Sequence, residues 1–415
     1  MHDIHFQGQK IGRSRRCQFR QFARGVLLLG CTALTACKHN DFPQMPDGYR
    51  EYAYITDGSS NTVTVLDLAD QRVDRVLQVG AQPTGIAANP QTNEIYAVNT
   101  QSGNVSVIDA EHNRVSATIP VQRLPYFIDV DSDGRRGYVA NSGSNSVSVL
   151  DLKTHREIAV GGTGEQPGLA KISPDSRTLV VTNRGSGSVS IYAVDSSPNA
   201  KPNQILRLRA SFNGCPGATD AIILPDSSKT FIACSGGHQV MAIALAAAPD
   251  SWAAKQDRTA LTDHMLTLLD VGRTPVHLAL KPDGGEVFSS NYDSNSISEI
   301  STWTNEVLGT YIIGQHPVRG LVAPDNSTLW VANFGADTVS LYSIDDGKLI
   351  TTLRTGSGPD AMALSTNGFL LLAVNAGSGD VSVIRTLEKP LPALFTMWPA
   401  GAQPNAIVVK AFTVK

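Results

Sequence analysis

One stretch decides the fold: Tyr96-Ala97-Val98-Asn99-Thr100-Gln101-Ser102-Gly103-Asn104-Val105-Ser106-Val107-Ile108-Asp109. Residues 95–99 are β-branched or aromatic, which favours a strand. Residues 105–109 alternate apolar with small polar side chains, as a second, half-buried strand does. The polar residues 101–104 between them are typical of a tight turn. The stretch therefore predicts a β-hairpin.

The same hairpin recurs along the chain. Other copies begin near residues 54, 138, 180, 231, 287, 329 and 371. Their spacing is about 42 residues except around the irregular fifth copy, and this period is typical of four-stranded propeller blades. An outer strand, a Gly/Pro corner such as Gly80-Ala81-Gln82-Pro83 and an inner strand of small residues complete each unit. Four strands and their turns therefore fill one period.

The chain begins and ends inside a unit. The first hairpin has no inner strand before it, and residues 405–410 form an inner strand with no hairpin after it. We predict that Ile407 and Val408 pair with Ala53 to Thr56, so that no sheet edge is left open. The result is an all-β, eight-bladed β-propeller. The alternative is seven blades, if the fifth unit does not form one.

The repeat resembles the YVTN family of β-propellers, from about Tyr52 to Lys410. The resemblance implies one propeller domain over residues 52–415, in a family of surface, periplasmic and binding proteins. It also implies that the repeated residues are structural rather than catalytic.

The composition of the chain and the motifs that it lacks argue against several classes of function. Charged residues make up 17% of the chain, and the formal net charge is −3. Basic and acidic residues are interspersed, whereas a nucleic-acid partner normally requires a clustered basic face. The chain has no G-x-S-x-G elbow, P-loop, dinucleotide fingerprint, H-E-x-x-H or C-x-x-C-H motif. We therefore expect no nucleic-acid partner and no enzyme of these classes.

The N-terminus has the pattern of an export signal. Basic residues precede a short apolar run at 26–33, and Leu34-Thr35-Ala36-Cys37 closes it. The ending resembles a bacterial lipobox, which implies a lipoprotein signal peptide over residues 1–36, diacylation of Cys37 and a stalk over residues 37–51. Lys38 after the lipid site favours the outer membrane, by resemblance to known sorting. The alternative is an ordinary signal peptide with a chance cysteine.

Two cysteines remain in the predicted domain. Cys215 lies in the corner before the inner strand of the fifth unit, and Cys234 stands where the other units usually carry Asn. In an oxidising compartment such a pair favours a disulfide, which requires the corner to fold back; two free buried thiols are the alternative.

Two insertions lengthen the connections between the third and fourth strands of units four and five, and we expect both on one face of the ring. They cover residues 196–203 and 246–255. The second contains enough Ala for a short helix, with Pro249 at its first position. Such insertions often mark a contact face, although a tolerated surface loop fits equally.

Candidate binding residues follow from departures from the repeat. The corners and hairpin turns of a propeller open on one face, around the mouth of the axial channel. The residues that follow the corners are Thr84, Tyr126, Gly168, Asp220, His277, Arg319, Asp360 and Asn405, and those that follow the strand-end Asn positions include Arg184, His238, Tyr292 and Phe334. As ligand or partner residues we select Tyr126, Arg184, Asp220, His277, Tyr292, His316, Arg319 and Asp360.

These residues allow more than one interpretation. His277 and His316 occupy corners of neighbouring units, where they could bind a metal or a tetrapyrrole iron, or could be ordinary hydrogen-bonded histidines. Asp220, Arg319 and Asp360 could hold a polar ligand, or could form one ion-pair network. The strand-end Asn residues, in contrast, have a sufficient structural role in bonding a tight turn or adopting positive φ.

We therefore expect a lipid-anchored periplasmic propeller that acts as a non-enzymatic binding or scaffold protein. Its partner, an envelope protein or a small ligand, would bind at the channel mouth, without a cofactor. The alternative is a tetrapyrrole-handling or redox-accessory protein resembling the d1-haem propellers, with His277 or His316 as iron ligand. A hydrolase or lyase is a third, more distant hypothesis.

Overall fold

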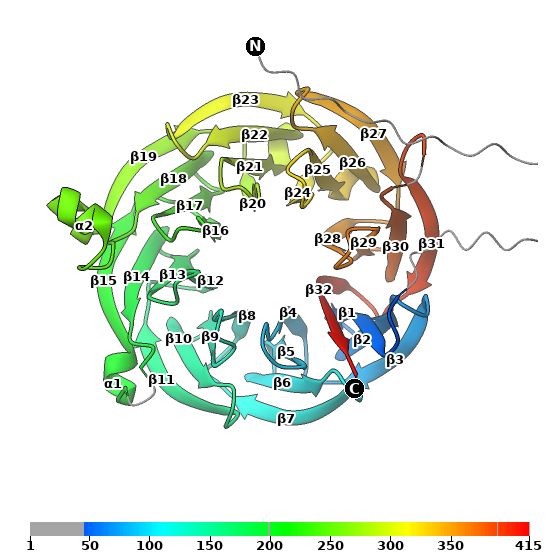
Figure 1. Cartoon of the computed structure of the whole chain (residues 1–415), viewed down its shortest axis with the longest axis horizontal. Coiled ribbons are helices and arrows are strands. Elements are labelled where there is room, and N and C mark those ends of the chain that lie inside the picture. The colour runs from blue at the N-terminus through cyan, green and yellow to red at the C-terminus, as the bar shows by residue number, and fades with distance from the viewer. Residues whose placement is uncertain (1–44, 198–199, 388, 415) are drawn as a thin grey trace, which may run out of the picture. The chain divides into compact units, whose positions relative to one another are not determined.

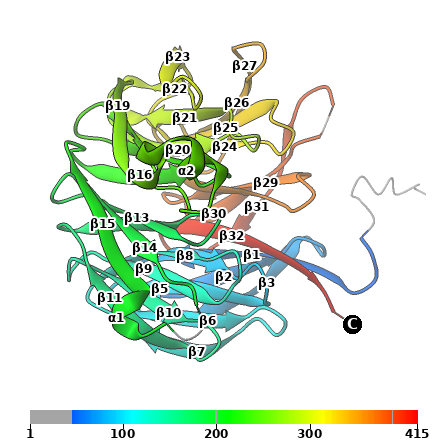
Figure 2. The same ribbon diagram turned by 60° about the vertical axis from the view of Figure 1, so that its left-hand side comes forward.

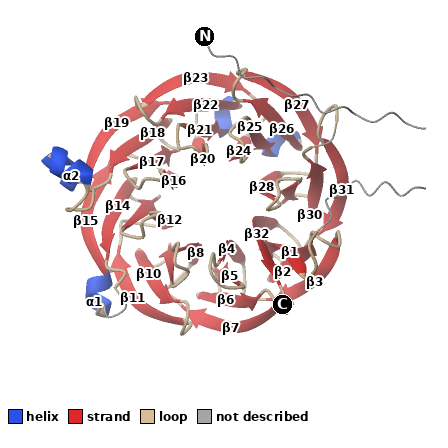
Figure 3. Cartoon of the chain, viewed as in Figure 1, coloured by secondary structure: helices blue, strands red, loops and turns tan. Residues whose placement is uncertain are grey.

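The structure, a computed structural model, describes residues 45–197, 200–387 and 389–414. These residues form eight four-stranded antiparallel sheets, which stand as blades around a central axis (Figure 1). In each blade one edge strand lies nearest the axis and the opposite edge strand lies at the rim, and helices are few and short (Figure 3). The inner strand is the first of its blade in chain order, except in the blade where the C-terminal strand takes this place. The chain is thus the eight-bladed β-propeller that the repeat predicts, and the fifth unit forms a complete blade.

The strands of the first four blades are as follows. Blade 1 contains β1 (Tyr49–Asp57), β2 (Thr62–Asp67), β3 (Arg72–Gln78) and β32 (Pro404–Thr413). Blade 2 contains β4 (Pro83–Ala88), β5 (Glu94–Asn99), β6 (Asn104–Asp109) and β7 (Arg114–Pro120). Blade 3 contains β8 (Pro125–Val130), β9 (Arg136–Asn141), β10 (Ser146–Asp151) and β11 (Arg156–Gly162). Blade 4 contains β12 (Pro167–Ile172), β13 (Thr178–Asn183), β14 (Ser188–Val194) and β15 (Leu206–Asn213).

The other four blades follow the same order. Blade 5 contains β16 (Ala218–Ile223), β17 (Lys229–Cys234), β18 (Gln239–Ala244) and β19 (His264–Asp270). Blade 6 contains β20 (Pro275–Leu280), β21 (Glu286–Asn291), β22 (Ser296–Ser301) and β23 (Glu306–Ile312). Blade 7 contains β24 (Pro317–Val322), β25 (Thr328–Asn333), β26 (Thr338–Ser343) and β27 (Lys348–Arg354). Blade 8 contains β28 (Pro359–Leu364), β29 (Leu370–Asn375), β30 (Asp380–Arg385) and β31 (Ala393–Pro399).

The ring closes between the two ends of the described chain. Strand β32 pairs antiparallel with β1, and Ile407 lies opposite Ile55 and Val408 opposite Tyr54. The predicted closure is therefore confirmed. Strand β1 begins at Tyr49, so the last residues of the predicted stalk, 49–51, belong to blade 1. The predicted signal peptide and Cys37 lie outside the described residues.

The core lies between neighbouring blades. Strands β5 and β6, for example, have side chains buried on both faces, and Tyr96 packs with Val139 of blade 3. Outer strands such as β23 alternate exposed and partly buried residues because only one of their faces is covered. Each fully buried Ile or Leu stabilises the fold by about 1.5–3 kcal/mol.

A contact between a corner glycine and a strand-end asparagine recurs in most blades. Asn99 is fully buried, and its Nδ2 donates to Asn104 Oδ1 (2.7 Å) and Ser106 Oγ (2.9 Å). A Cβ at Gly80 would lie 2.7 Å from Asn99 Cβ, so only glycine fits against it. The same contact joins Gly164 to Asn183, Gly272 to Asn291, Gly314 to Asn333 and Gly356 to Asn375. The asparagines therefore have a structural role.

Positive φ falls on other residues than the strand-end asparagines. In every blade, the residue immediately before the inner strand has a φ between 47° and 63°, as Gln82 and His316 do. A second series lies in the hairpin turns, as at Asn61 and Asn295. Asn291, in contrast, has φ of −102°. The positive-φ positions are therefore occupied by other residues of the corners and the hairpin turns.

Blade 5 replaces the glycine–asparagine contact with a disulfide. Cys215 and Cys234 are bonded, with their Cα atoms 4.7 Å apart. Cys215 stands three residues before β16, as Gly80 stands before β4, and Cys234 ends β17 where Asn99 ends β5. The corner does fold back, since Ala218 lies opposite Cys234 in the sheet.

The helices of both insertions lie at the outer side of the ring (Figure 1), and both come forward in the turned view of Figure 2. They are α1 (Pro202–Ile205) and α2 (Trp252–Gln256), and the 3-10 turn η1 (Arg258–Leu261) follows α2. The predicted helix therefore begins at Trp252 and not at Pro249. Two further 3-10 turns, η2 (Tyr292–Ser294) and η3 (Phe334–Ala336), lie in the hairpin turns of blades 6 and 7. Of the helices in the described ranges, none has the length and apolar character needed to cross a membrane.

Candidate ligand site in the axial channel

A β-bulge sets the geometry of every innermost strand. In β24 the pairing with β25 shifts between Pro317 and Arg319. Because one residue is inserted, the predicted corner residues occupy two different positions. Thr84, Tyr126, Gly168, Asp360 and Asn405 are the bulged residues, whereas Asp220, His277 and Arg319 follow the bulge and pair in the sheet. The sequence prediction treated them as one series, and this was wrong.

Asp220 and His277 connect consecutive inner strands. Each inner strand has one unpaired edge, whose amides need a partner. Asp220 Oδ2 accepts from the backbone N–H of Leu278 (2.9 Å) in the next blade. His277 repeats the arrangement, since its Nδ1 accepts from the N–H of Gly320 (3.2 Å). These side chains therefore bond the strand edges that face the axis.

The bonding of His277 fixes its protonation. Because Nδ1 accepts a hydrogen bond, the imidazole proton lies on Nε2, which is 3.7 Å from Asp220 Oδ2. Each of the two side chains is 15% exposed. Burial, with a contribution from the Arg319 guanidinium, holds the pKa of His277 well below its usual value, and burial raises the pKa of Asp220. His277 is therefore neutral at pH 7.

A second pair in the channel was missed by the sequence prediction. Asp129 Oδ1 lies 3.2 Å from Lys171 Nζ, and its Oδ2 accepts from the N–H of Ile172 (3.1 Å). Both residues lie deeper along their inner strands, two positions beyond the one that Asp220 occupies in β16. Since strand side chains alternate with period two, extending the corner positions by two residues would have found them.

A cavity of about 360 Å³ opens where the inner strands begin. Arg319, Asp360 and Tyr126 line it, together with Thr84, Phe127, Met362, Asn405 and Ile407. Tyr126 is 44% exposed. The cavity thus brings together three of the predicted ligand residues from blades 3, 7 and 8.

Arg319 and Asp360 are unpaired in this cavity. The Arg319 Nε is buried and has no hydrogen-bond partner. Neither side chain forms a hydrogen bond or ion pair with another residue of the described chain. Burial raises the pKa of Asp360, and the positive charge of Arg319 partly opposes this. Asp220, Arg319 and Asp360 are therefore not linked in a direct ion-pair network.

The other predicted residues lie on the hairpin turns, except His316, which lies in the corner before β24. The ring of His316 stacks on that of Tyr292, with centroids 4.3 Å apart, and its Nδ1–H donates to the Tyr292 carbonyl (3.2 Å). Arg184 is exposed, and its side-chain carbons pass over Gly168. His238 Nδ1 accepts from the N–H of Thr274 (3.1 Å). Phe334 covers Gly358. None of these five residues lines the channel cavity.

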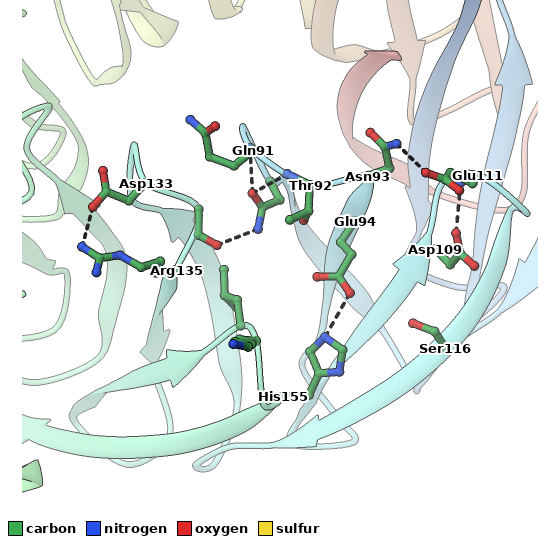
Figure 4. Close-up of a pocket in the computed structure, with 14 residues that line it drawn as sticks. Gln91, Thr92, Asn93, Glu94, Asp109, Glu111, Ser116, Asp133, Arg135 and His155 are labelled. Carbon is green, nitrogen blue, oxygen red and sulfur yellow. Dashed lines mark hydrogen bonds and ion pairs between the residues drawn. The ribbon is translucent and has the colours of Figure 1, made fainter. Parts of the chain in front are cut away.

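A larger cavity of about 660 Å³ lies between blades 2 and 3, at the turns that join their first to their second and their third to their fourth strands (Figure 4). Its charges are largely paired. His155 Nε2 lies 3.1 Å from Glu94 Oε1, Arg135 pairs with Asp133, and Asn93 donates to Glu111. Within the ranges that the structure describes, no cluster of three or more His, Cys, Asp or Glu side chains could hold a metal ion.

Comparison with known proteins supports the fold and no more. No protein-family model matches the chain, and no curated protein matches it. The dihydro-haem d1 dehydrogenase NirN is 15% identical, with a TM-score of 0.68 over 89% of this chain and 76% of that one. Hydrazine synthase from Kuenenia stuttgartiensis is 22% identical, with a TM-score of 0.54 over 80% and 92%. A proposed 6-phosphogluconolactonase from Bacteroides uniformis is 16% identical, with a TM-score of 0.59 over 87% and 99%.

Proposed function

We propose that this protein is a non-enzymatic binding protein that holds its ligand in the axial channel, at the mouth on the hairpin-turn face. The observation that carries the proposal is the pair Arg319 and Asp360, which line a cavity of about 360 Å³ and form no hydrogen bond or ion pair with another described residue. An unsatisfied buried polar group typically costs about 1–3 kcal/mol, and more when charged. The repeated contacts that hold the blades together do not involve these unpaired groups. A ligand is therefore their natural partner.

The cavity favours binding over catalysis. His277, the histidine of the channel, already uses Nδ1 for Gly320 and directs Nε2 toward Asp220. The hydroxyl of Thr84 is bonded to Thr100 Oγ1 and to the Tyr126 carbonyl. Among the described residues, no Ser, Thr or Cys side chain is hydrogen-bonded to His277. A nucleophile with an adjacent base, which acyl transfer needs, is therefore lacking in this part of the chain.

The cellular setting is part of the proposal. The lipobox-like residues 34–37 support export and anchoring through Cys37 at the outer membrane, and the recurring hairpin supports membership of the YVTN family. Tyr49, where β1 begins, lies at the opposite end of its strand from the hairpin turn at Asn61. The channel mouth therefore opens on the face away from the point where the chain enters blade 1.

Affinity isolation tests the proposal. The full-length protein, purified from detergent-solubilised envelopes, is compared with an Arg319→Ala, Asp360→Ala double variant. The matched control is Arg123→Gln, which alters an exposed arginine in the corner of blade 3. We expect the ligand to be retained by the wild type and the control and lost from the double variant. Equal retention by all three proteins would show that the channel mouth is not the site.

A second candidate is a tetrapyrrole-binding protein, and the geometry of His316 favours it. The Nδ1–H of His316 donates to a carbonyl, which leaves Nε2 as the free nitrogen, as in most metal-ligating histidines. His277 is less suitable because both of its nitrogens face protein groups. The likeness in fold to NirN is consistent with this candidate. A Soret band on adding haem, lost in His316→Ala and kept in His277→Ala, would support it; no band would remove it.

A further inference from the structure

The channel cavity contains two opposite charges that are not bonded to each other. Arg319 lies on β24 and Asp360 on β28, the inner strands of neighbouring blades, and both line the same cavity. The guanidinium acts on the pKa of Asp360 through space, yet the two groups form no ion pair. A gap therefore separates them.

Two other polar side chains of the cavity are already bonded within the protein. Thr84 donates to the Tyr126 carbonyl (3.0 Å). Asn405 Oδ1 accepts from Thr56 Oγ1 (2.6 Å), and its Nδ2 donates to the Pro83 carbonyl (3.0 Å). These two groups fix the wall and have little hydrogen-bonding capacity left. The unpaired charged groups of the lining are the cation Arg319 and the anion Asp360.

The remaining wall is largely apolar, and the Tyr126 hydroxyl is its polar group. Tyr126, Phe127, Met362 and Ile407 line the cavity together with Ile86 and the alanines of β28 and β32. A volume of about 360 Å³ is at the small end of ligand pockets, which suits a ligand of about ten to twenty heavy atoms. The cavity thus combines one site for an anion, one site for a cation and an apolar wall.

We infer that the ligand is a small zwitterion of the α-amino acid class with an apolar side chain. Its carboxylate pairs with Arg319, its ammonium with Asp360, and its side chain packs against Tyr126 and Met362. This inference rests on the proposed function and names the ligand class of the same site. A zwitterion neutralises both unpaired charges at once, whereas a simple anion leaves Asp360 unpaired and a simple cation leaves Arg319 unpaired.

Isothermal titration calorimetry with matched ligands tests the inference on the full-length protein in detergent at pH 7.5. The probes are L-phenylalanine, L-leucine and L-methionine. For each that binds, the N-acetyl derivative removes the ammonium charge and the amide derivative removes the carboxylate. Because hydrogen bonds to charged groups contribute about 1.5–3 kcal/mol, we expect each derivative to bind at least about tenfold more weakly than its parent.

Variants assign the two ends of the ligand. Arg319→Gln should weaken the amino acid at least about tenfold and remove the discrimination against the amide. Asp360→Asn should weaken the amino acid similarly but remove the discrimination against the N-acetyl derivative. Arg123→Gln should behave as the wild type. Circular dichroism confirms that each variant is folded, and a variant that does not fold is replaced by Arg319→Met or Asp360→Ser, which also remove the charge.

Three outcomes would overturn the inference. No saturable binding of any probe would exclude the amino-acid class. An N-acetyl derivative that binds as tightly as its parent would identify a simple anion site. Unchanged binding in both variants would place the amino acid elsewhere. In the first two cases affinity isolation can still show ligand loss in the Arg319→Ala, Asp360→Ala variant, so failure of this inference is distinguishable from failure of the proposed function.

Discussion

Cys215 and Cys234 form the covalent counterpart of a contact that other blades make between a glycine and an asparagine. In blade 7 the strand-end Asn333 donates to Thr338 and Ser340, five and seven residues later. The corresponding residues after Cys234 are Gln239 and Met241, and Met241 cannot accept in the same way. A disulfide holds the corner of blade 5 without needing those partners, which gives a physical reason for the exchange.

Removing this disulfide should destabilise the fold. The bond closes a loop with a sequence separation of 19 residues, and a loop of that length is worth about 3 kcal/mol. We expect Cys215→Ala, Cys234→Ala to lower the free energy of unfolding by that amount in urea. Cys215→Gly, Cys234→Asn should not restore stability unless Met241→Ser supplies the missing acceptor. Equal stability of wild type and double alanine variant would contradict this account.

The corner glycines should tolerate no side chain. A Cβ at Gly314 would lie 2.4 Å from Asn333 Cγ, which is inside van der Waals contact. We expect Gly314→Ala to cost about 1–3 kcal/mol, measured by urea denaturation. The control is Gly162→Ala, because a Cβ at Gly162 meets no atom within 4 Å. If both substitutions cost the same, the close contact is not the cause.

The unpaired charges of the channel should lower the stability of the ligand-free protein. Asp360 is partly buried without a bonded partner, so Asp360→Asn removes a charge without removing a bond. We expect a gain of about 1 kcal/mol in the free energy of unfolding, from chemical denaturation of ligand-free protein. A loss of stability would show that Asp360 makes a favourable interaction in the folded state.

Ligand affinity should depend on pH through the same carboxylate. Burial raises the pKa of Asp360, so it takes up a proton above the pH at which an ordinary Asp does. The protonated form cannot pair with an ammonium group. We therefore expect amino-acid affinity to fall as pH decreases through the raised pKa, and Asp360→Asn to remove this dependence. His277 should not contribute near neutral pH, because its pKa is held well below the usual value.

The fold could be predicted in detail from the sequence because the hairpin recurs at a regular spacing. That spacing indicates which strands pair and which residues lie opposite each other. The pairing of Ile407 with Ile55 followed from where the chain enters and leaves the repeat. The start of blade 1 at Tyr49 did not, since residues 49–51 precede the repeated pattern. The helix of the second insertion was predicted to begin at Pro249 and begins at Trp252, and α1 was not predicted, because nothing repeats in these segments.

The site was predicted only in part. Departures from the repeat identified Tyr126, Arg319 and Asp360, which do share a cavity. The β-bulge after each corner could not be recognised from the sequence, so Asp360 and Arg319 were treated as equivalent positions. The sequence also left open whether the charges of the channel form ion pairs, since this depends on distances between strands of different blades. The absence of a partner for Arg319 Nε is therefore a finding of the three-dimensional structure.

The central claim is that a ligand binds in the channel mouth, and hydrogen–deuterium exchange tests it most directly. Exchange is measured with and without the small molecules that are released from the protein after its purification from envelopes. A ligand in the channel mouth should slow exchange in β24 and β28, the strands that carry Arg319 and Asp360, and leave the cavity of Figure 4 unchanged. Slower exchange confined to residues 89–94 and 152–155, which line that other cavity, would contradict the account.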